Sequence, residues 1–213
     1  MVYFCLMTLV KILGKEKKEE ILDVAENLFS QFGFEAVSVR QLAKEASINV
    51  AMVSYYFGSK EQLFKQVIER KLINTGNLIA SSNNLDCWDK IFLIANSYID
   101  GFFQNRTITQ IIYREINLNQ RLDIVQMLSE HLKRNFGNIS LIISEGIDSG
   151  VFRKVDIELT VMTIIGVARM YAHSPTIACK IFKEKNETDV FSDKYRRRLK
   201  NHMKEVISAL LKP

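Results

Sequence analysis

Residues 38–64 read SVRQLAKEASINVAMVSYYFGSKEQLF, and this stretch decides the fold. Ser38 and Ser59 each stand three residues before a glutamine, which is the capping-box spacing that opens a helix. Asn49 is another residue type that caps helices, and Gly58 is typical of a helix end. The stretch therefore predicts two short helices joined by a tight turn, with a third helix following.

A supporting helix is expected before this stretch. From Lys15 to Phe32 apolar residues recur at helical spacing, and Gly33 follows as a stop signal. Two short helices joined by a tight turn behind a supporting helix form the helix-turn-helix arrangement, whose second short helix enters the major groove of DNA. We therefore expect residues 15–73 to form such a domain together with a connecting helix.

The rest of the chain predicts further helices and no sheet. Only two prolines and nine glycines interrupt 213 residues, of which 47% are hydrophobic. Polar residues between 74 and 86 indicate a break before a carboxy-terminal part, 74–213. Residues 157–172 are apolar nearly all round, which predicts a buried helix, and an amphipathic helix follows at 190–211. We expect an all-α fold of about nine helices.

The opening residues 1–14 are apolar and are interpreted as a flexible arm. They are too few to span a bilayer, and an interfacial membrane anchor is the alternative. Cys5, Cys87 and Cys179 lie far apart without a CxxC pair, which favours a reducing compartment over disulfides or a cysteine zinc site. We expect a cytoplasmic protein without a membrane partner.

The net charge of +5 supports a polyanionic partner only weakly. Residues 15–71 hold nine basic and nine acidic side chains, whereas residues 180–213 hold ten basic and five acidic ones. The positive excess therefore lies outside the predicted helix-turn-helix domain.

The motifs within residues 17–65 make the interpretation specific. They are Ile21 to Ala25, Leu28-Phe29, Gly33-Phe34, Ser38 to Ala43 and Tyr55 to Phe64. This pattern resembles the amino-terminal signature of the tetracycline-repressor (TetR) family. The resemblance implies an effector-responsive regulator that binds double-stranded DNA as a homodimer, and repression is the family expectation.

The resemblance also implies which side chains contact DNA. The helix that begins after Asn49 would read bases, with Asn49, Val50, Ala51 and Met52 closest to the base edges; only Asn49 offers hydrogen bonds, while the others can contact thymine methyl groups. The expected phosphate contacts are Ser38, Arg40, Tyr55, Tyr56 and Lys60. Core packing is an equal alternative for Tyr55, and a solvated surface position is the alternative for Arg40.

Two positions depart from the family pattern. Ser47 stands where glycine is usual in the turn, and we expect this turn not to demand a positive φ. Ser54 replaces the first tyrosine of the common Leu-Tyr-Tyr-His-Phe run, which removes one expected phosphate contact.

For the carboxy-terminal part, the resemblance implies a four-helix dimer interface built from residues 156–173 and 190–211. Two reading helices one DNA turn apart would then match a palindromic operator. It also implies a small-molecule effector pocket among the middle helices, and no cofactor or metal is expected. Candidate lining residues, for each of which core packing is at least as good an explanation, are Trp88, Tyr98, Phe102, Arg114, Met127, Met170 and His173.

An enzyme and a peripheral membrane or helical interaction protein are the alternatives. The sequence has no HExxH motif and no local pairing of a nucleophile with a base, and its three histidines are scattered, so we assign no catalytic or metal-binding residues. The apolar start and the basic final helix motivate the membrane alternative. The two capping boxes and the motif pattern argue against it.

Overall fold

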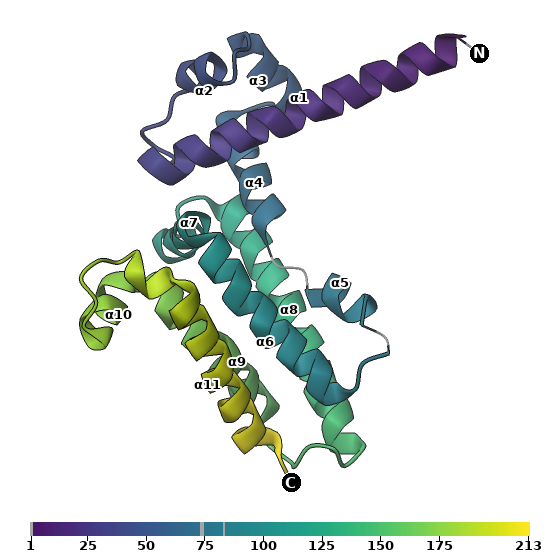
Figure 1. The fold of residues 1–213 in the computed structure, drawn as a ribbon. Coiled ribbons are helices and arrows are strands. Elements are labelled where there is room, and N and C mark those ends of the chain that lie inside the picture. Colours follow the sequence, from purple (N-terminus) through teal and green to yellow (C-terminus); the bar gives the residue numbers. More distant parts are fainter. Residues whose placement is uncertain (1, 73–74, 83) are drawn as a thin grey trace. The chain divides into compact units, whose positions relative to one another are not determined.

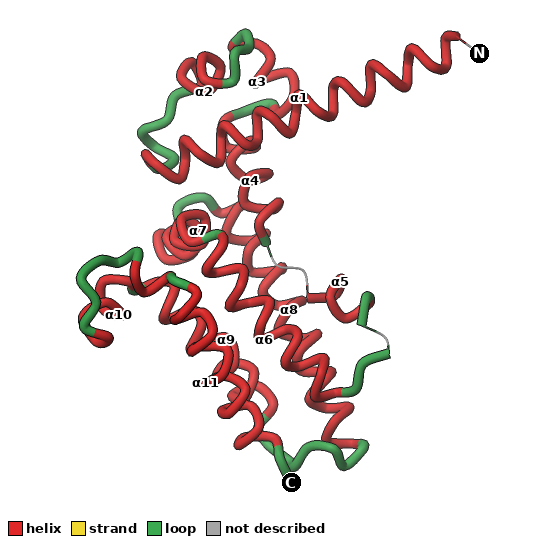
Figure 2. The backbone as a smooth tube through the Cα atoms, viewed as in Figure 1, coloured by secondary structure: helices red, strands yellow, loops and turns green. Residues whose placement is uncertain are grey.

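The structure is a computed structural model that describes residues 2–72, 75–82 and 84–213. Its contacts divide the chain into two compact units, Met1–Leu72 and Ile73–Pro213. Every regular element within the described residues is a helix, so the all-α prediction is confirmed (Figure 1, Figure 2). The boundary predicted between residues 73 and 74 falls on two residues outside the described ones.

The first unit consists of four helices: α1 (Val2–Phe32), α2 (Val39–Glu45), α3 (Val50–Phe57) and α4 (Lys60–Lys71). Helices α2 and α3 contact each other, α1 contacts α2 and α4, and α3 also contacts α4. The buried rings of Phe29, Phe34 and Phe64 form the centre, with ring centroids 4.6 to 5.6 Å apart. Aromatic pairs at such separations add to the stabilisation by apolar burial.

Side-chain caps begin the three short helices, as the sequence predicts. The Ser38 hydroxyl oxygen accepts a hydrogen bond from the Gln41 backbone N–H (3.1 Å), and the Ser59 hydroxyl oxygen accepts one from the Gln62 N–H (3.2 Å). The Asn49 side-chain carbonyl accepts one from the N–H of Ala51 (2.9 Å). Each cap satisfies a backbone donor that the helix itself leaves unpaired.

Helix α1 differs from its expected extent. It begins at Val2, whereas the periodicity of buried residues placed its start near Lys15. The preceding residues contain no proline, and their composition of leucine, methionine and valine permits helical backbone. The sequence before Lys15 is apolar almost throughout and has no alternation of polar and apolar faces, so periodicity could not detect this extension.

The turn between α2 and α3 contradicts the expectation for Ser47. Its φ is +51°, in the left-handed region where a side chain with a β-carbon is disfavoured. The turn is closed by hydrogen bonds from the Ser47 N–H to the Lys44 carbonyl (3.1 Å) and from the Ile48 N–H to the Ala43 carbonyl (2.9 Å). Both hydrogen bonds form only because the chain reverses its direction at Ser47, so this turn does require a positive φ at that residue.

The second unit is a helical body. Its elements are α5 (Thr75–Ala80), α6 (Cys87–Gln104), α7 (Arg106–Leu118), α8 (Leu122–Asp148), α9 (Ile157–His173), α10 (Pro175–Phe182), the 3₁₀ helix η1 (Asp189–Phe191) and α11 (Asp193–Leu211). Helix α6 contacts α8, α9 and α11 and lies among them in Figure 1. Its residues Ile91, Ile94 and Ile99 are fully buried in the main core.

Two short helices were not foreseen. Helix α5 lies in the stretch predicted as a break, and α10 begins at Pro175, between the helices expected at 157–172 and 190–211. Proline is well tolerated in the first turn of a helix because its missing N–H would be unpaired there. With these two, the described residues form eleven α-helices in place of about nine.

Helix α9 is less buried than predicted. Val161, Ile164 and Ala168 pack into the core, but Leu159, Met162 and Met170 are exposed. An apolar composition on all sides was taken to mean burial on all sides. Within its own unit, α9 buries only one face.

Gly146 in α8 allows a close contact with Phe152. A β-carbon at position 146 would lie 2.1 Å from the buried Phe152 ring, so Gly146→Ala is expected to lower the free energy of unfolding by about 1–3 kcal/mol. Gly137→Ala in the same helix is the control: nothing lies near its β-carbon, and the variant should gain about 0.5–1 kcal/mol from helix propensity. Thermal unfolding of both variants checks this, and equal shifts would contradict it.

Relief of the strain at position 47 should be measurable. Ser47→Gly removes the β-carbon at a positive φ and is expected to raise the free energy of unfolding by about 0.5–1 kcal/mol. Ser47→Ala keeps the β-carbon and should show no such gain. Chemical denaturation, followed by circular dichroism, compares the two variants with the parent, and a gain from alanine would show that the serine hydroxyl rather than the backbone is responsible.

Candidate nucleic-acid interface

The amino-terminal end of α3 is presented to solvent. Val53 and Phe57 are buried against the neighbouring helices, whereas Asn49, Val50 and Ala51 are exposed. Met52 is half-buried. One face of α3 therefore packs on its own domain, while the four residues at its beginning are accessible. A helix that inserts into a major groove needs this arrangement.

Two tyrosines stand at the end of α3. The Tyr55 side chain is 80% exposed, so the alternative that it packs in the core is wrong. The Tyr56 ring is half-buried and packs against the rings of Tyr55 and Phe57, with centroids 5.1 and 6.3 Å away. Both phenols can donate a hydrogen bond, and neighbouring rings restrict their orientation.

Ser38 and Arg40 lie at the beginning of α2. The Ser38 hydroxyl accepts the capping bond from Gln41, which leaves its own O–H free to donate. Arg40 is exposed and forms no ion pair with the described residues. A hydroxyl, a guanidinium and the free backbone donors of a helix start together suit an anion such as phosphate.

Lys60 has a different position from the one expected of a phosphate contact. Its ammonium group donates hydrogen bonds to the backbone carbonyls of Phe34 (2.9 Å) and Val37 (2.8 Å), and it lies 4.1 Å from the centre of the Phe34 ring. Lys60 therefore ties the start of α4 to the loop between α1 and α2. The sequence could not reveal this role, because the two carbonyls lie more than 20 residues away.

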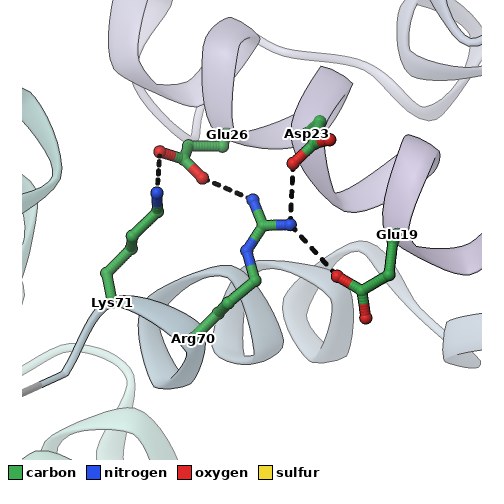
Figure 3. Close-up of polar contacts among 5 residues, drawn as sticks. All are labelled: Glu19, Asp23, Glu26, Arg70 and Lys71. Carbon is green, nitrogen blue, oxygen red and sulfur yellow. Dashed lines mark hydrogen bonds and ion pairs between the residues drawn. The ribbon is translucent and has the colours of Figure 1, made fainter.

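A cluster of charged residues joins the end of α4 to α1 (Figure 3). The Arg70 guanidinium lies 2.8 Å from the Asp23 carboxylate, 3.3 Å from that of Glu19 and 2.5 Å from that of Glu26, and the Lys71 ammonium lies 2.9 Å from Glu26. Burial alone would lower the pKa of Arg70, but the hydrogen bonds with Glu26 and Asp23 outweigh it and raise that pKa.

Sequence reasoning missed this cluster. The three carboxylates recur every three or four residues along α1, which places them on one face of the helix, and this spacing was the available signal.

The candidate effector residues do not form one site. Tyr98 and Phe102 are buried together in α6, whereas the Trp88 ring packs on Phe92 and Phe152. Met127 is half-buried and Arg114 is exposed. His173 packs against the Tyr113 ring at 5.6 Å, and the exposed Met170 lines a groove between α9, α10 and α11.

A buried polar group in the second unit includes one of these candidates. The Asn135 amide donates a hydrogen bond to the Tyr98 hydroxyl (3.1 Å) and lies 3.1 Å from the His131 Nε2 atom. Burial raises the pKa of Tyr98 to about 12, although its hydrogen bond with Asn135 acts in the opposite direction. Sequence reasoning missed Asn135 because a single asparagine in a helix carries no signal of its surroundings.

The described part of the chain contains no group of three or more histidine, cysteine or acidic side chains placed to hold a metal ion. None of its helices is both long enough and apolar enough to cross a membrane.

Comparison with known proteins supports the geometry of the first unit. Residues 21–67 match the family model described as bacterial regulatory proteins, tetR family. The probable HTH-type transcriptional regulator YttP of Bacillus subtilis is 30% identical over 135 residues, which are 61% of this chain and 64% of YttP. The chain thus spans slightly less than two thirds of that relative.

Solved structures show that the fold extends over both units. The crystal structure of an HlyIIR mutant protein is 24% identical, with a TM-score of 0.67, over 92% of this chain and 96% of that one. FadR from Bacillus subtilis, solved in complex with stearoyl-CoA, is 20% identical, with a TM-score of 0.65, over 89% of this chain and 96% of that one. The helix-turn-helix of this chain is therefore that of the tetR family of bacterial regulatory proteins, and its all-helical body has the fold of these solved structures.

Proposed function

We propose that this protein is a DNA-binding transcriptional repressor that acts in the cytoplasm and is released from its operator by a small molecule. The proposal rests mainly on one observation: the start of α3 is exposed, while Val53 and Phe57 of the same helix are buried in the core of the unit. A helix mounted in this way can enter a major groove without disturbing its own domain. The relatives are transcriptional regulators, which agrees with this function.

The proposed contacts divide into base contacts and phosphate contacts. Asn49, Val50, Ala51 and Met52 face base edges; the Asn49 carbonyl already accepts the capping bond, so its amide N–H groups are the donors available for a base. Phosphates are bound by Ser38, Arg40, Tyr55 and Tyr56. Lys60 holds the loop before α2, and through it the position of the Ser38 cap.

The protein is proposed to bind a palindromic operator as a homodimer through α9 and α11. Two-fold symmetry of the protein places two reading helices on equivalent half-sites, about one DNA turn apart. The exposed apolar residues of α9 support this interface, because apolar patches on soluble proteins mark contact surfaces.

The effector is proposed to bind among α6, α7, α8 and α9. Tyr98, His131 and Asn135 place a hydroxyl, an imidazole and an amide in an otherwise apolar core, and a few polar groups in apolar surroundings are typical of small-molecule sites. FadR was solved with stearoyl-CoA, which makes a long-chain acyl-CoA the first compound to test.

A selection on random duplex DNA, repeated at several salt concentrations, tests the function. Recovery of a palindrome with half-sites about one turn apart, bound more weakly as salt rises, is the expected result. If no duplex is enriched at any salt concentration, mass spectrometry of the denatured protein shows whether a co-purified effector was holding the non-binding state. With no effector present, that result would contradict the proposal.

Substitution of Arg40 tests whether this residue contacts a DNA phosphate. Arg40→Gln is expected to weaken binding to every duplex and to lower the slope of log affinity against log salt by about 1, without changing the preferred sequence. Lys212→Gln removes the same charge from the end of the second unit and serves as the control for net charge. A changed base preference in Arg40→Gln would show that Arg40 reads bases.

Substitution of Lys60 tests whether its hydrogen bonds to the Phe34 and Val37 carbonyls stabilise the first unit. Lys60→Met leaves the Phe34 and Val37 carbonyls without their donor and should lower the free energy of unfolding by about 1–3 kcal/mol. Lys44→Met removes an exposed lysine of α2 and should leave stability nearly unchanged. Thermal unfolding without DNA distinguishes the variants; unchanged stability in Lys60→Met, together with weaker DNA binding, would restore Lys60 as a phosphate contact.

A further inference from the structure

A groove of about 410 Å³ lies between α9, α10 and α11, and its walls are mostly apolar. Its volume is within the range of pockets that hold small molecules. None of Tyr98, His131 and Asn135 lines it, so the groove is separate from the proposed effector site. Residues of a single chain form all of its walls.

The groove leaves apolar side chains in contact with water. Met170 of α9 and Ile177 and Ile181 of α10 line it, and their exposed fractions lie between 49% and 62%. Exposed apolar area of this kind is unfavourable in water, and a bound hydrocarbon chain would cover it. Along α11 the groove runs from Tyr195 to His202. At the helical rise this is about 10 Å, the length of an extended chain of roughly ten carbon atoms.

Arg198 places a cation at the wall of this groove. Its guanidinium lies 4.8 Å from the centre of the Phe182 ring and 6.0 Å from that of the Tyr195 ring, and both rings also line the groove. Such cation–π contacts position a guanidinium without neutralising its charge. The apolar groove therefore has a fixed positive group at one of its walls.

A polar hollow adjoins the groove on the outer face of α11. Arg198 and His202 line both the groove and the hollow, and Arg197 lines the hollow. Among the described residues, Lys194 of the hollow has an acidic partner, Glu184, whereas neither Arg197 nor Arg198 has one. A carboxylate suits this position, because an arginine can bind both of its oxygens and the histidine ring can donate a further hydrogen bond.

Glu205 limits the negative charge that the hollow can accept. It lines the hollow three residues after His202 along α11. Its carboxylate repels a head group with two negative charges more strongly than one with a single charge. A carboxylate carries one negative charge, whereas a phosphate monoester carries nearly two at neutral pH. The charges around the hollow therefore favour a carboxylate.

We propose that this groove binds a free medium-chain fatty acid, with its hydrocarbon chain between α9, α10 and α11 and its carboxylate at Arg198 and His202. The site goes beyond the proposed function, because it is additional to the effector site among the middle helices. Leu159 and Met162 are exposed on α9 but do not line the groove, so they remain available to the proposed homodimer.

Isothermal titration calorimetry of the full chain with decanoate tests the site. Arg198→Gln removes the guanidinium and is expected to raise the dissociation constant of decanoate at least about tenfold, because charge-assisted hydrogen bonds are lost. The uncharged 1-decanol has a chain of the same length and should bind the parent and Arg198→Gln about equally. Lys133→Gln, at an exposed position of α8, is the control for net charge and should leave the affinity for decanoate unchanged.

Ile181 provides a second measurement on the opposite wall. Ile181→Glu places a negative charge at an exposed position of the groove, so the variant should keep its helix content by circular dichroism. It is expected to raise the dissociation constant of decanoate at least about tenfold, because it repels the carboxylate and makes the wall polar. Ile181→Val keeps the wall apolar and should stay within about threefold of the parent.

Four results would overturn the proposed site. The first is that decanoate does not bind the parent, and the second is that neither Arg198→Gln nor Ile181→Glu weakens its binding. The third is an equal loss of affinity for decanoate and 1-decanol in Arg198→Gln, which would show that the carboxylate is not recognised. The fourth is a loss of decanoate affinity in Tyr98→Phe alone, which would place the fatty acid at the proposed effector site.

Sedimentation equilibrium separates a bound fatty acid from a second copy of the chain. If the groove holds a fatty acid, Ile181→Glu should change decanoate binding and leave self-association as in the parent. If Ile181→Glu instead weakens self-association while the parent ignores decanoate, another copy covers the groove and the proposed site is wrong.

Discussion

The contact between α1 and α4 is the constraint on which the first unit depends. Phe29 and Phe34 come from α1 and the loop after it, and Phe64 comes from α4, so their three rings join segments that are distant in the sequence. Lys60 secures the beginning of α4 and Arg70 secures its end. Helix α3 packs on α2 and α4, so its exposed start has a defined direction only because these contacts hold.

The second unit combines a hydrogen-bonded polar cluster in its core with an exposed apolar surface. Helix α6 fills the centre of the core, and the polar side chains of Tyr98, Asn135 and His131 are joined by hydrogen bonds, which removes the cost of burying them. The outer side of α9 remains apolar and exposed. The homodimer proposed through α9 and α11 would cover this apolar side.

Local patterns predicted the helix starts of the first unit well, because a cap is a contact between residues two or three positions apart. Ser38, Asn49 and Ser59 cap the helices expected of them. The same reasoning was wrong for Ser47, whose φ depends on how α2 and α3 must cross, and it did not anticipate the carbonyls bound by Lys60. The Ser47 φ and the Lys60 hydrogen bonds both depend on contacts between separate segments of the chain, which local sequence patterns do not reveal.

The sequence by itself determined the all-α class, the position of the helix-turn-helix and the residues at the start of its second short helix, because these follow from capping, periodicity and motif spacing. Only the tertiary structure decided that Lys60 holds a loop, that Arg70 gathers three carboxylates, that Tyr55 is exposed and that α9 keeps one apolar side outside the core. The physical reason is that burial and ion pairing belong to groups brought together in space, and the same residue types can be solvated or buried until the packing of other helices determines their surroundings.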